Sequence, residues 1–422
     1  MRFSDTLVAE PDKLTPWSYK PTSKSNPLTW GDVSSLRTSL NEQKEELKVG
    51  LNKSLAGPID DAQTSEQVGV NLDPIMERLS KSYFMSESVN PKLLLNKANK
   101  NTLNKKLQPW ADQLNQNAEV VRKNMGIKVF FDQLKDVPCV IVAAGPSLKN
   151  AIARLKTLQS KAVIICLGPT MRPMVSRGIY PHFVNAHDAN GPMPENNFGG
   201  GPKFFRGVDA SKTVALFVNY IHPMTIAVYN GPKAFYYVDD PGIPVYKTMA
   251  LACDGPDRPD GSFLKSCITG GSSVAHTALY CAIRMGCNPI TFVGLDLSYP
   301  DLTNSHFESD NAKSVGTQRL IPCETVAGRK VFTNLPFYSY KTVFDSMAPA
   351  MVQHYGINLN NSSQNDDGSM AGIVHAGLEP MPFDEWVEKY AQNERPELNK
   401  IQEIVSKYTT NKEQGVNNGS KL

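Results

Sequence analysis

Short polar sequences follow several apolar runs in this chain, and these junctions hold the residues that could do chemistry. The first junction comes after the run Cys139–Ala143 and opens a helical pattern; it consists of Ala144, Gly145, Pro146, Ser147 and Leu148. Glycine lets a ligand approach the backbone, proline suits the first helical turn, and serine can cap that turn or donate to a phosphate. The first N–H groups of a helix lack partners within it, so this junction predicts an anion site. A tight turn with a capped helix is the alternative.

A second set of backbone donors precedes the helical pattern at 275–283 and consists of Gly270, Gly271, Ser272 and Ser273. The next apolar run, Ile290–Leu295, ends at Asp296. In a parallel sheet, ligands bind beyond the carboxyl ends of the strands, and Asp296 is expected on that side. Two glycine turns and a capping aspartate are the alternative interpretation.

Two further segments offer groups that could accept a proton. The run His182–Ala186 delivers Asn185, His187 and Asp188 to the same edge of the predicted sheet. His306 lies soon after Asp296 in a polar, loop-like segment. Histidine and carboxylate side chains are the usual general bases, although a lone histidine is more often a satisfied structural residue.

The elements that must position these residues alternate between strand and helix. Several apolar runs are continuous, as expected for strands buried on both faces: 139–143, 162–167, 182–186, 214–219, 235–238 and 290–295. Helical spacing separates some of them, for example at 148–158 and 275–283. This order predicts an α/β fold, a Rossmann-like doubly wound and mainly parallel sheet.

Three regions are expected along the chain. Residues 1–110 carry leucines at helical spacing and predict a mostly helical region for packing, oligomer contacts or docking onto a larger assembly. Residues 111–390 would form the Rossmann-like nucleotide-binding domain. Residues 391–422 predict one helix followed by a disordered polar tail.

Composition narrows the class of protein. The 422 residues carry a net charge of +3, so no strong attraction to nucleic acid or membranes is expected. No apolar run is long enough to span a bilayer, and the first residues lack a signal-peptide core. The seven cysteines form no CxxC pair, which favours reduced thiols over a disulfide or zinc framework. We therefore expect a cytoplasmic protein.

Taken together, the junctions resemble a known superfamily. The segments VIVAAGPSL, RGIYPHFVNAHDAN and GGSSVAHTALYCAIRMGCNPITFVGLDLSY, followed by SHF, are similar to the motility accessory factor (Maf) glycosyltransferases. The same superfamily contains the archaeal 6-hydroxymethylpterin diphosphokinase, MptE-like. The later segment from CETVAGRKVF to AGIVHAGLEP is also similar, so the resemblance covers roughly 110–385.

The core also resembles bacterial sialyltransferases that use CMP-activated sugars. Their Gly-x-Gly-Pro-Ser-Leu loop corresponds to residues 143–148, with Ala143 in place of the first glycine. Their Gly-x-Asp-x-Tyr segment corresponds to residues 294–299, with Tyr299 displaced by one residue. The resemblance implies that AAGPSL supports a nucleotide or its phosphate. Gly145→Val is then expected to weaken nucleotide binding without unfolding the protein.

Two activities follow from the resemblance. One is glycosyl transfer from a CMP-activated nonulosonic or similar sugar, with donors at 145–148 and 270–273 and Tyr299 stabilising the leaving phosphate. His306, His187 or Asp188 would serve as base, and Asp296 is expected to work at the site as an acid–base group. The other is diphosphate transfer from ATP, with Mg²⁺ held by Asp188 and Asp296.

A third hypothesis is non-enzymatic: the chain is a binding or assembly module of a flagellar or viral complex. The retained GPS, GGSS and GLD segments disfavour complete loss of the site. For the enzymatic hypotheses the acceptor stays open between a protein, a glycan, a nucleic acid and a small molecule.

Overall fold

The computed structural model describes residues 109–189, 201–239, 266–269, 273–299, 307 and 320–408. The predicted helices before residue 109 and the polar tail after 408 lie outside these residues. So do four of the candidate site residues: Gly270, Gly271, Ser272 and His306.

A ten-stranded sheet forms the centre of the described part, and every neighbouring pair of its strands runs parallel. Its strands are β1 (Met125–Gly126), β2 (Cys139–Val142), β3 (Val163–Leu167), β4 (Phe183–Ala186), β5 (Val214–Val218), β6 (Lys233–Asp239), β7 (Cys267–Thr269), β8 (Ile290–Val293), β11 (Leu359–Asn361) and β12 (Glu379–Pro380). An antiparallel hairpin of β9 (Leu320–Glu324) and β10 (Lys330–Asn334) stands apart from this sheet. The predicted α/β fold with a mainly parallel sheet is confirmed.

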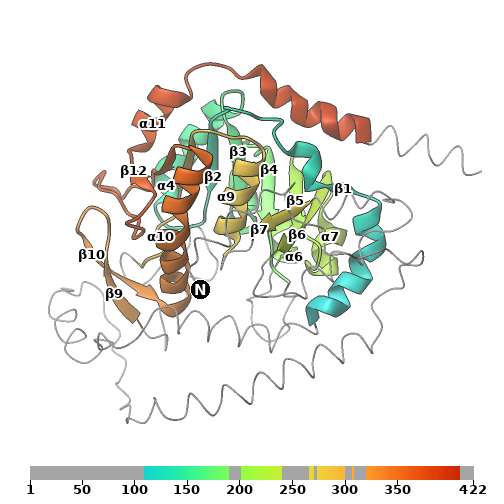
Figure 1. Ribbon diagram of the computed structural model, residues 1–422, viewed down its shortest axis with the longest axis horizontal. Helices are drawn as coiled ribbons and strands as arrows, with labels where there is room; N and C mark the ends of the chain where they lie inside the picture. The colour runs from blue at the N-terminus through green and yellow to red at the C-terminus, as the bar shows by residue number, and fades with distance from the viewer. Residues whose placement is uncertain are drawn as a thin grey trace, which may run out of the picture.

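Helices flank the sheet, with α9 and α10 in front of it in Figure 1. The described helices are α4 (Leu148–Leu155), α5 (Gly168–Val175), α6 (Pro202–Phe205), α7 (Pro223–Val228), α9 (Val274–Arg284), α10 (Leu335–Tyr355) and α11 (Phe383–Tyr390), with helical turns also at 109–122 and 399–408. The rings of His276 on α9 and Phe344 on α10 stack with centroids 3.8 Å apart, so these two helices pack side by side. Among the described helices, none is long and apolar enough to cross a bilayer.

Local sequence explains where these elements begin and end. Strands β2, β3 and β5 are buried along their whole length, and β-branched residues dominate β2 and β3. Helix α10 begins where the Asn334 side chain accepts a hydrogen bond from the Phe337 N–H at 2.8 Å. It ends at Gly356, whose left-handed φ of 62° suits glycine.

The strand order reverses between β2 and β8. Strands β3 to β6 follow β2 on one side, in the order β6-β5-β4-β3-β2. The chain then returns through α9 and places β8 and β11 on the other side of β2. Loops that leave adjacent strands in opposite directions open a crevice at such a reversal, which we call the switch point. The loops after β2 and β8 carry the AAGPSL and GLD segments, so both lie at the switch point.

Candidate functional site

The loops after β2 and β8 remain paired beyond the ends of their strands. The Ala143 N–H donates to the Val293 carbonyl at 2.8 Å, and the Gly145 N–H donates to the Gly294 carbonyl at 2.7 Å. A Cβ atom on Gly145 would lie 2.5 Å from the Gly294 oxygen and 2.7 Å from Cγ of Asp296. Glycine is therefore required here by the neighbouring loop. The expectation that Gly145→Val would affect only ligand binding is wrong.

Asp296 and Ser147 form the centre of the candidate site. The Ser147 N–H donates to Oδ2 of Asp296 at 2.8 Å, and the Ser147 hydroxyl donates to Oδ1. Asp296 is only 3% exposed. Burial raises the pKa of Asp296 to about 6, while the two hydrogen bonds from Ser147 act in the opposite direction. The carboxyl group therefore titrates close to neutral pH, which suits a general base.

The predicted set of free backbone donors at residues 145–148 is wrong, because the protein itself uses them. The Gly145 and Ser147 N–H groups bind Gly294 and Asp296, as described above, and Pro146 has no N–H group. The Leu148 N–H donates to the Gly145 carbonyl at 3.1 Å, and the Leu148 side chain is fully buried. Ser147 precedes α4 without a side-chain capping bond. The anion at the start of α4 is Asp296 itself.

A second layer of polar side chains fixes the backbone next to Asp296. The Leu295 N–H donates to Oγ of Ser363 at 2.8 Å, and Nδ2 of Asn361 donates to the Leu295 carbonyl at 3.3 Å. The Ser363 hydroxyl also donates to Oδ1 of Asn361 at 2.7 Å. Sequence reasoning missed these two residues. The available signal was the polar run NNSSQ at 360–364, which begins directly after Leu359, the first residue of β11.

A cavity of about 300 Å³ lies beside Asp296. Its walls come from the start of α4, the loop after β8, the β9–β10 hairpin and the loop after β11. Among the residues that line it are Ser147, Lys149, Asp296, Ser298, Thr325 and Arg329. The volume is at the lower end of the range for small-molecule sites.

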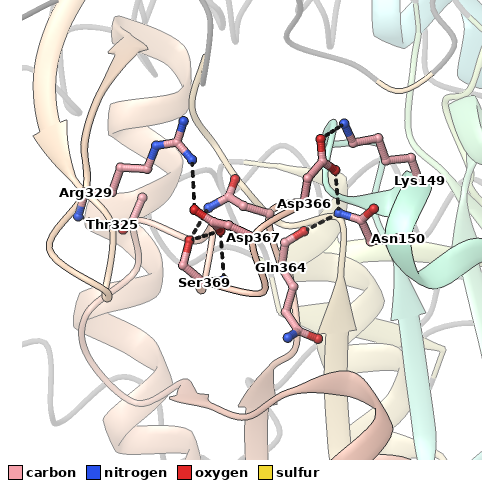
Figure 2. Close-up of polar contacts among 9 residues, drawn as sticks. Lys149, Asn150, Thr325, Arg329, Gln364, Asp366, Asp367 and Ser369 are labelled. Carbon is pink, nitrogen blue, oxygen red and sulfur yellow. Dashed lines mark hydrogen bonds and ion pairs between the residues drawn. The ribbon is translucent and has the colours of Figure 1, made fainter.

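Two cations and two carboxylates face each other at this cavity, as Figure 2 shows. Nζ of Lys149 lies 2.7 Å from Oδ2 of Asp366, and NH1 of Arg329 lies 3.9 Å from Oδ2 of Asp367. The hydrogen bond from Lys149 lowers the pKa of Asp366, and the hydrogen bonds from Ser369 lower the pKa of Asp367. The sequence Asp366-Asp367-Gly368-Ser369 has the composition of an ordinary surface turn, so nothing in it indicated a site.

Asn185 and His187 have internal partners at the end of β4. Asn185 is fully buried; its Nδ2 donates to Oγ1 of Thr277 at 2.9 Å, and its Oδ1 accepts from the Tyr236 hydroxyl at 2.9 Å. The predicted ligand-binding role of Asn185 is therefore wrong, since no ligand can reach it. Nε2 of His187 lies 2.6 Å from the Tyr220 hydroxyl, and burial lowers the pKa of His187 to about 4.

Asp188 and Asp296 do not face each other across one site. Strands β3 and β2 lie between β4, which precedes Asp188, and β8, which precedes Asp296. Three strand spacings place their strand ends about 14 Å apart, whereas a magnesium ion binds its oxygen ligands at about 2 Å. The predicted magnesium site of these two residues is wrong. Within the described ranges there is also no cluster of three or more histidine, cysteine, aspartate or glutamate residues.

The side chains of the two remaining predicted residues make contacts within the protein. The Tyr299 hydroxyl accepts from Nδ2 of Asn334 at 2.7 Å, and Tyr299 is 5% exposed, so it links the loop after β8 to β10. Ser273 precedes α9, and its Oγ lies 2.7 Å from Nδ1 of His276. Phe307, the neighbour of His306, donates its N–H to the Ala144 carbonyl at 2.8 Å.

The fold and site together define a doubly wound α/β protein whose candidate site lies at the switch point of a parallel sheet. Residues 112–302 match the family model described as 6-hydroxymethylpterin diphosphokinase MptE-like. This part of the chain is therefore similar to the MptE-like family, in agreement with the resemblance that its motifs indicated. The sialyltransferase resemblance stays a prediction.

One solved structure and the curated proteins give the remaining comparisons. The chain is similar to the structure of a Maf glycosyltransferase from Magnetospirillum magneticum AMB-1, with 14% identity and a TM-score of 0.46. The similarity covers 80% of this chain and 54% of that one, so the chain spans about half the length of that glycosyltransferase. No curated protein matches the chain.

The contact between Ser147 and Asp296 can be tested by Ser147→Ala. This change removes one of the two hydrogen bonds that stabilise the carboxylate, so we expect the pKa of Asp296 to rise above its value of about 6. Carbon-13 NMR of the labelled carboxyl group would measure the titration. Ser298→Ala, in the same cavity, serves as the control. An unchanged or lower pKa in Ser147→Ala would contradict the assignment.

Proposed function

We propose that this chain is a nucleotide-sugar-dependent glycosyltransferase that uses the cavity at the switch point. The observation that carries the proposal is Asp296, a buried carboxyl group with a pKa of about 6 on the wall of the cavity. The basic side chains of Lys149 and Arg329 line the same cavity. Glycosyl transfer needs a base for the acceptor hydroxyl and positive charge for the leaving phosphate. Asp296 meets the first need, and Lys149 and Arg329 meet the second.

The proposed reaction is a displacement at the anomeric carbon of the donor sugar. The acceptor oxygen forms a bond to this carbon as the bond from the carbon to the phosphate oxygen breaks. The phosphate leaves with the bonding electron pair, and Asp296 takes the proton of the acceptor hydroxyl. Above pH 6 the carboxylate is mostly ionised and can accept this proton. Ser147 orients it through two hydrogen bonds.

The proposed donor is a CMP-activated nonulosonic or similar sugar. Support for CMP comes from the likeness of AAGPSL and GLDLSY to the loops of sialyltransferases. The acceptor is proposed only as a hydroxyl compound. This proposal replaces the expected phosphate contacts of the backbone at 145–148 with contacts from Lys149 and Arg329, because Asp296 and nearby carbonyls occupy those N–H groups.

Diphosphate transfer from ATP is the second candidate. The description of the matching family favours it, and the adjacent carboxylates of Asp366 and Asp367 at the cavity are its specific observation. Carboxylates bind the magnesium that accompanies ATP. The pair Asp188 and Asp296 does not fit this role, because β2 and β3 separate the two strand ends.

A thermal-shift panel separates these candidates. The ligands are CMP, CMP-, UDP- and GDP-sugars and ATP, each with and without magnesium. We expect a CMP-sugar to raise the melting temperature without added metal, since a ligand at about a hundred times its Kd adds about 2.7 kcal/mol of stability. Stabilisation by ATP only with magnesium would favour diphosphate transfer. A flat response to every ligand would contradict nucleotide handling.

A further inference from the structure

The two cations of the cavity face carboxylates from a single loop. Lys149 belongs to the first turn of α4, and Arg329 belongs to the turn between β9 and β10. Their partners, Asp366 and Asp367, are neighbours in the loop after β11 (Figure 2). We call residues Gln364–Ser369 the acidic loop. It bridges two elements that are otherwise distant in the sequence.

The acidic loop is attached more firmly to α4 than to the hairpin. Besides the contact with Lys149, Oδ1 of Asp366 accepts from Nδ2 of Asn150 at 3.2 Å, and the same Nδ2 lies 2.9 Å from the Gln364 carbonyl. Asp367 instead accepts two hydrogen bonds within the loop, from the Ser369 N–H at 3.0 Å and the Ser369 hydroxyl at 2.6 Å. The contact between Arg329 and Asp367, at 3.9 Å, is therefore the looser of the two.

Both ion pairs are exposed to solvent. The side chains of Lys149 and Asp366 are 51% and 70% exposed, and those of Arg329 and Asp367 are 46% and 64% exposed. Exposed ion pairs contribute little free energy, so the two carboxylates can be displaced at low cost. A phosphate offers more charge and more acceptor oxygens than a carboxylate, and arginine binds it through two parallel hydrogen bonds.

We propose that the acidic loop is an internal competitor for phosphate, and that a donor binds by exchanging its phosphate for Asp366 and Asp367 on Lys149 and Arg329. The choice of a nucleotide as the donor rests on the proposed function, but the exchange itself requires only an anion. The loop then selects ligands whose phosphates bind the two cations better than carboxylates do.

The contacts favour an anion over a metal ion as the ligand of this site. A cation at Asp366 would stand against the ammonium group of Lys149, only 2.7 Å from Oδ2. The other oxygen of Asp366 already accepts from Asn150, and one oxygen of Asp367 accepts from Ser369. Hydrogen-bond donors and cationic groups therefore surround the two carboxylates. A phosphate that displaced the carboxylates would bind the same groups.

Inorganic pyrophosphate tests the exchange directly, by isothermal titration of the full chain in magnesium-free buffer. The variant Asp366→Asn/Asp367→Asn keeps the shape of the loop and removes both charges. We expect it to bind pyrophosphate about tenfold more tightly than the wild type, a difference of about 1.4 kcal/mol. Adding Lys149→Gln to this variant should remove the gain. Circular dichroism melting confirms that each variant is folded.

The matched control is Asp384→Asn/Glu385→Gln, which makes the same change in net charge on α11, away from the cavity lining. Its pyrophosphate affinity should stay within about twofold of wild type. An equal gain in pyrophosphate affinity by the control would show that the effect comes from the change in net charge alone, and this would overturn the proposal. Unchanged or weaker binding by the loop variant would overturn it too. The titrations are repeated with magnesium, and weaker binding by the loop variant in that buffer alone would assign the carboxylates to a metal ion and overturn the exchange.

The same proteins separate this proposal from the proposed function. Tighter pyrophosphate binding by the loop variant, with no response of the wild type to any nucleotide sugar, would support the exchange and contradict the donor. Binding of a CMP-sugar by the wild type, with no change in the loop variant for either ligand, would support the donor and overturn the exchange.

Discussion

Asp296→Asn should lower turnover by about a hundredfold or more, as expected for loss of a general base. The amide keeps the shape of the side chain and can still accept from the Ser147 N–H, but it cannot take a proton. In the wild type, activity should rise with pH through about 6 as Asp296 ionises. Activity of the variant, measured against pH with the preferred donor, should lack this rise.

Stability provides the complementary measurement for the same variant. The pKa of Asp296 is raised from 3.8 to about 6, so the unfolded chain releases this proton first as the pH rises. The contribution of Asp296 to the free energy of unfolding therefore falls between about pH 4 and pH 6. Above this window, the buried charge of Asp296 lowers the free energy of unfolding by about 3 kcal/mol relative to the protonated form. Asp296→Asn avoids this cost.

The melting temperature of Asp296→Asn relative to wild type should therefore increase with pH across this window. Asp384→Asn, which replaces an exposed carboxylate on α11, is the control for a general charge effect. Normal specific activity combined with a large fall in melting temperature at pH 7.5 would show that Asp296 has only a structural role.

Gly145→Ala should destabilise the protein by about 3 kcal/mol, the cost of forcing extra volume into a packed position. The added Cβ would meet the Gly294 oxygen at 2.5 Å and Cγ of Asp296 at 2.7 Å. Neither neighbour can move freely, because the Gly145–Gly294 hydrogen bond continues the pairing of β2 with β8. Chemical denaturation would measure the change in free energy of unfolding.

Gly168→Ala is the matched control for this prediction. A Cβ there would lie 3.1 Å from a ring carbon of Phe204, a side chain that can turn aside. Its effect on the free energy of unfolding should be clearly smaller. Equal stability of Gly145→Ala and the wild type would show that the two loops are not packed as described.

The sequence was sufficient for the type of fold because the buried strands carry a local signal. The run Cys139–Ala143 predicted β2 (Cys139–Val142) almost to the residue, and Ile290–Leu295 predicted β8 (Ile290–Val293). Continuous apolar residues in short runs are what a strand covered on both faces requires. The junctions after these strands pointed to Ser147 and Asp296 separately, although they lie 149 positions apart.

No such local signal indicated the order of the strands or the part of the cavity that the loop after β11 lines. Asp188 and Asp296 both follow strands, but their separation depends on β2 and β3 lying between them, which long-range pairing decides. The free N–H group expected at Ser147 was absent because the distant carboxylate of Asp296 accepts a hydrogen bond from it. Asp366 and Asp367 look like turn residues and acquire a possible role only when the loop after β11 meets α4.

The pairing of β11 with β8 also has a consequence for how this protein can be divided. The family model ends at residue 302, before β11 begins at Leu359. A fragment cut there would turn β8 into an edge strand, with a row of unpaired N–H and C=O groups open to other chains. It would also lack Asn361 and Ser363, which hold the Leu295 peptide beside Asp296. The segment that the family model matches is therefore too short to present Asp296 beside a β8 strand that is paired on both sides.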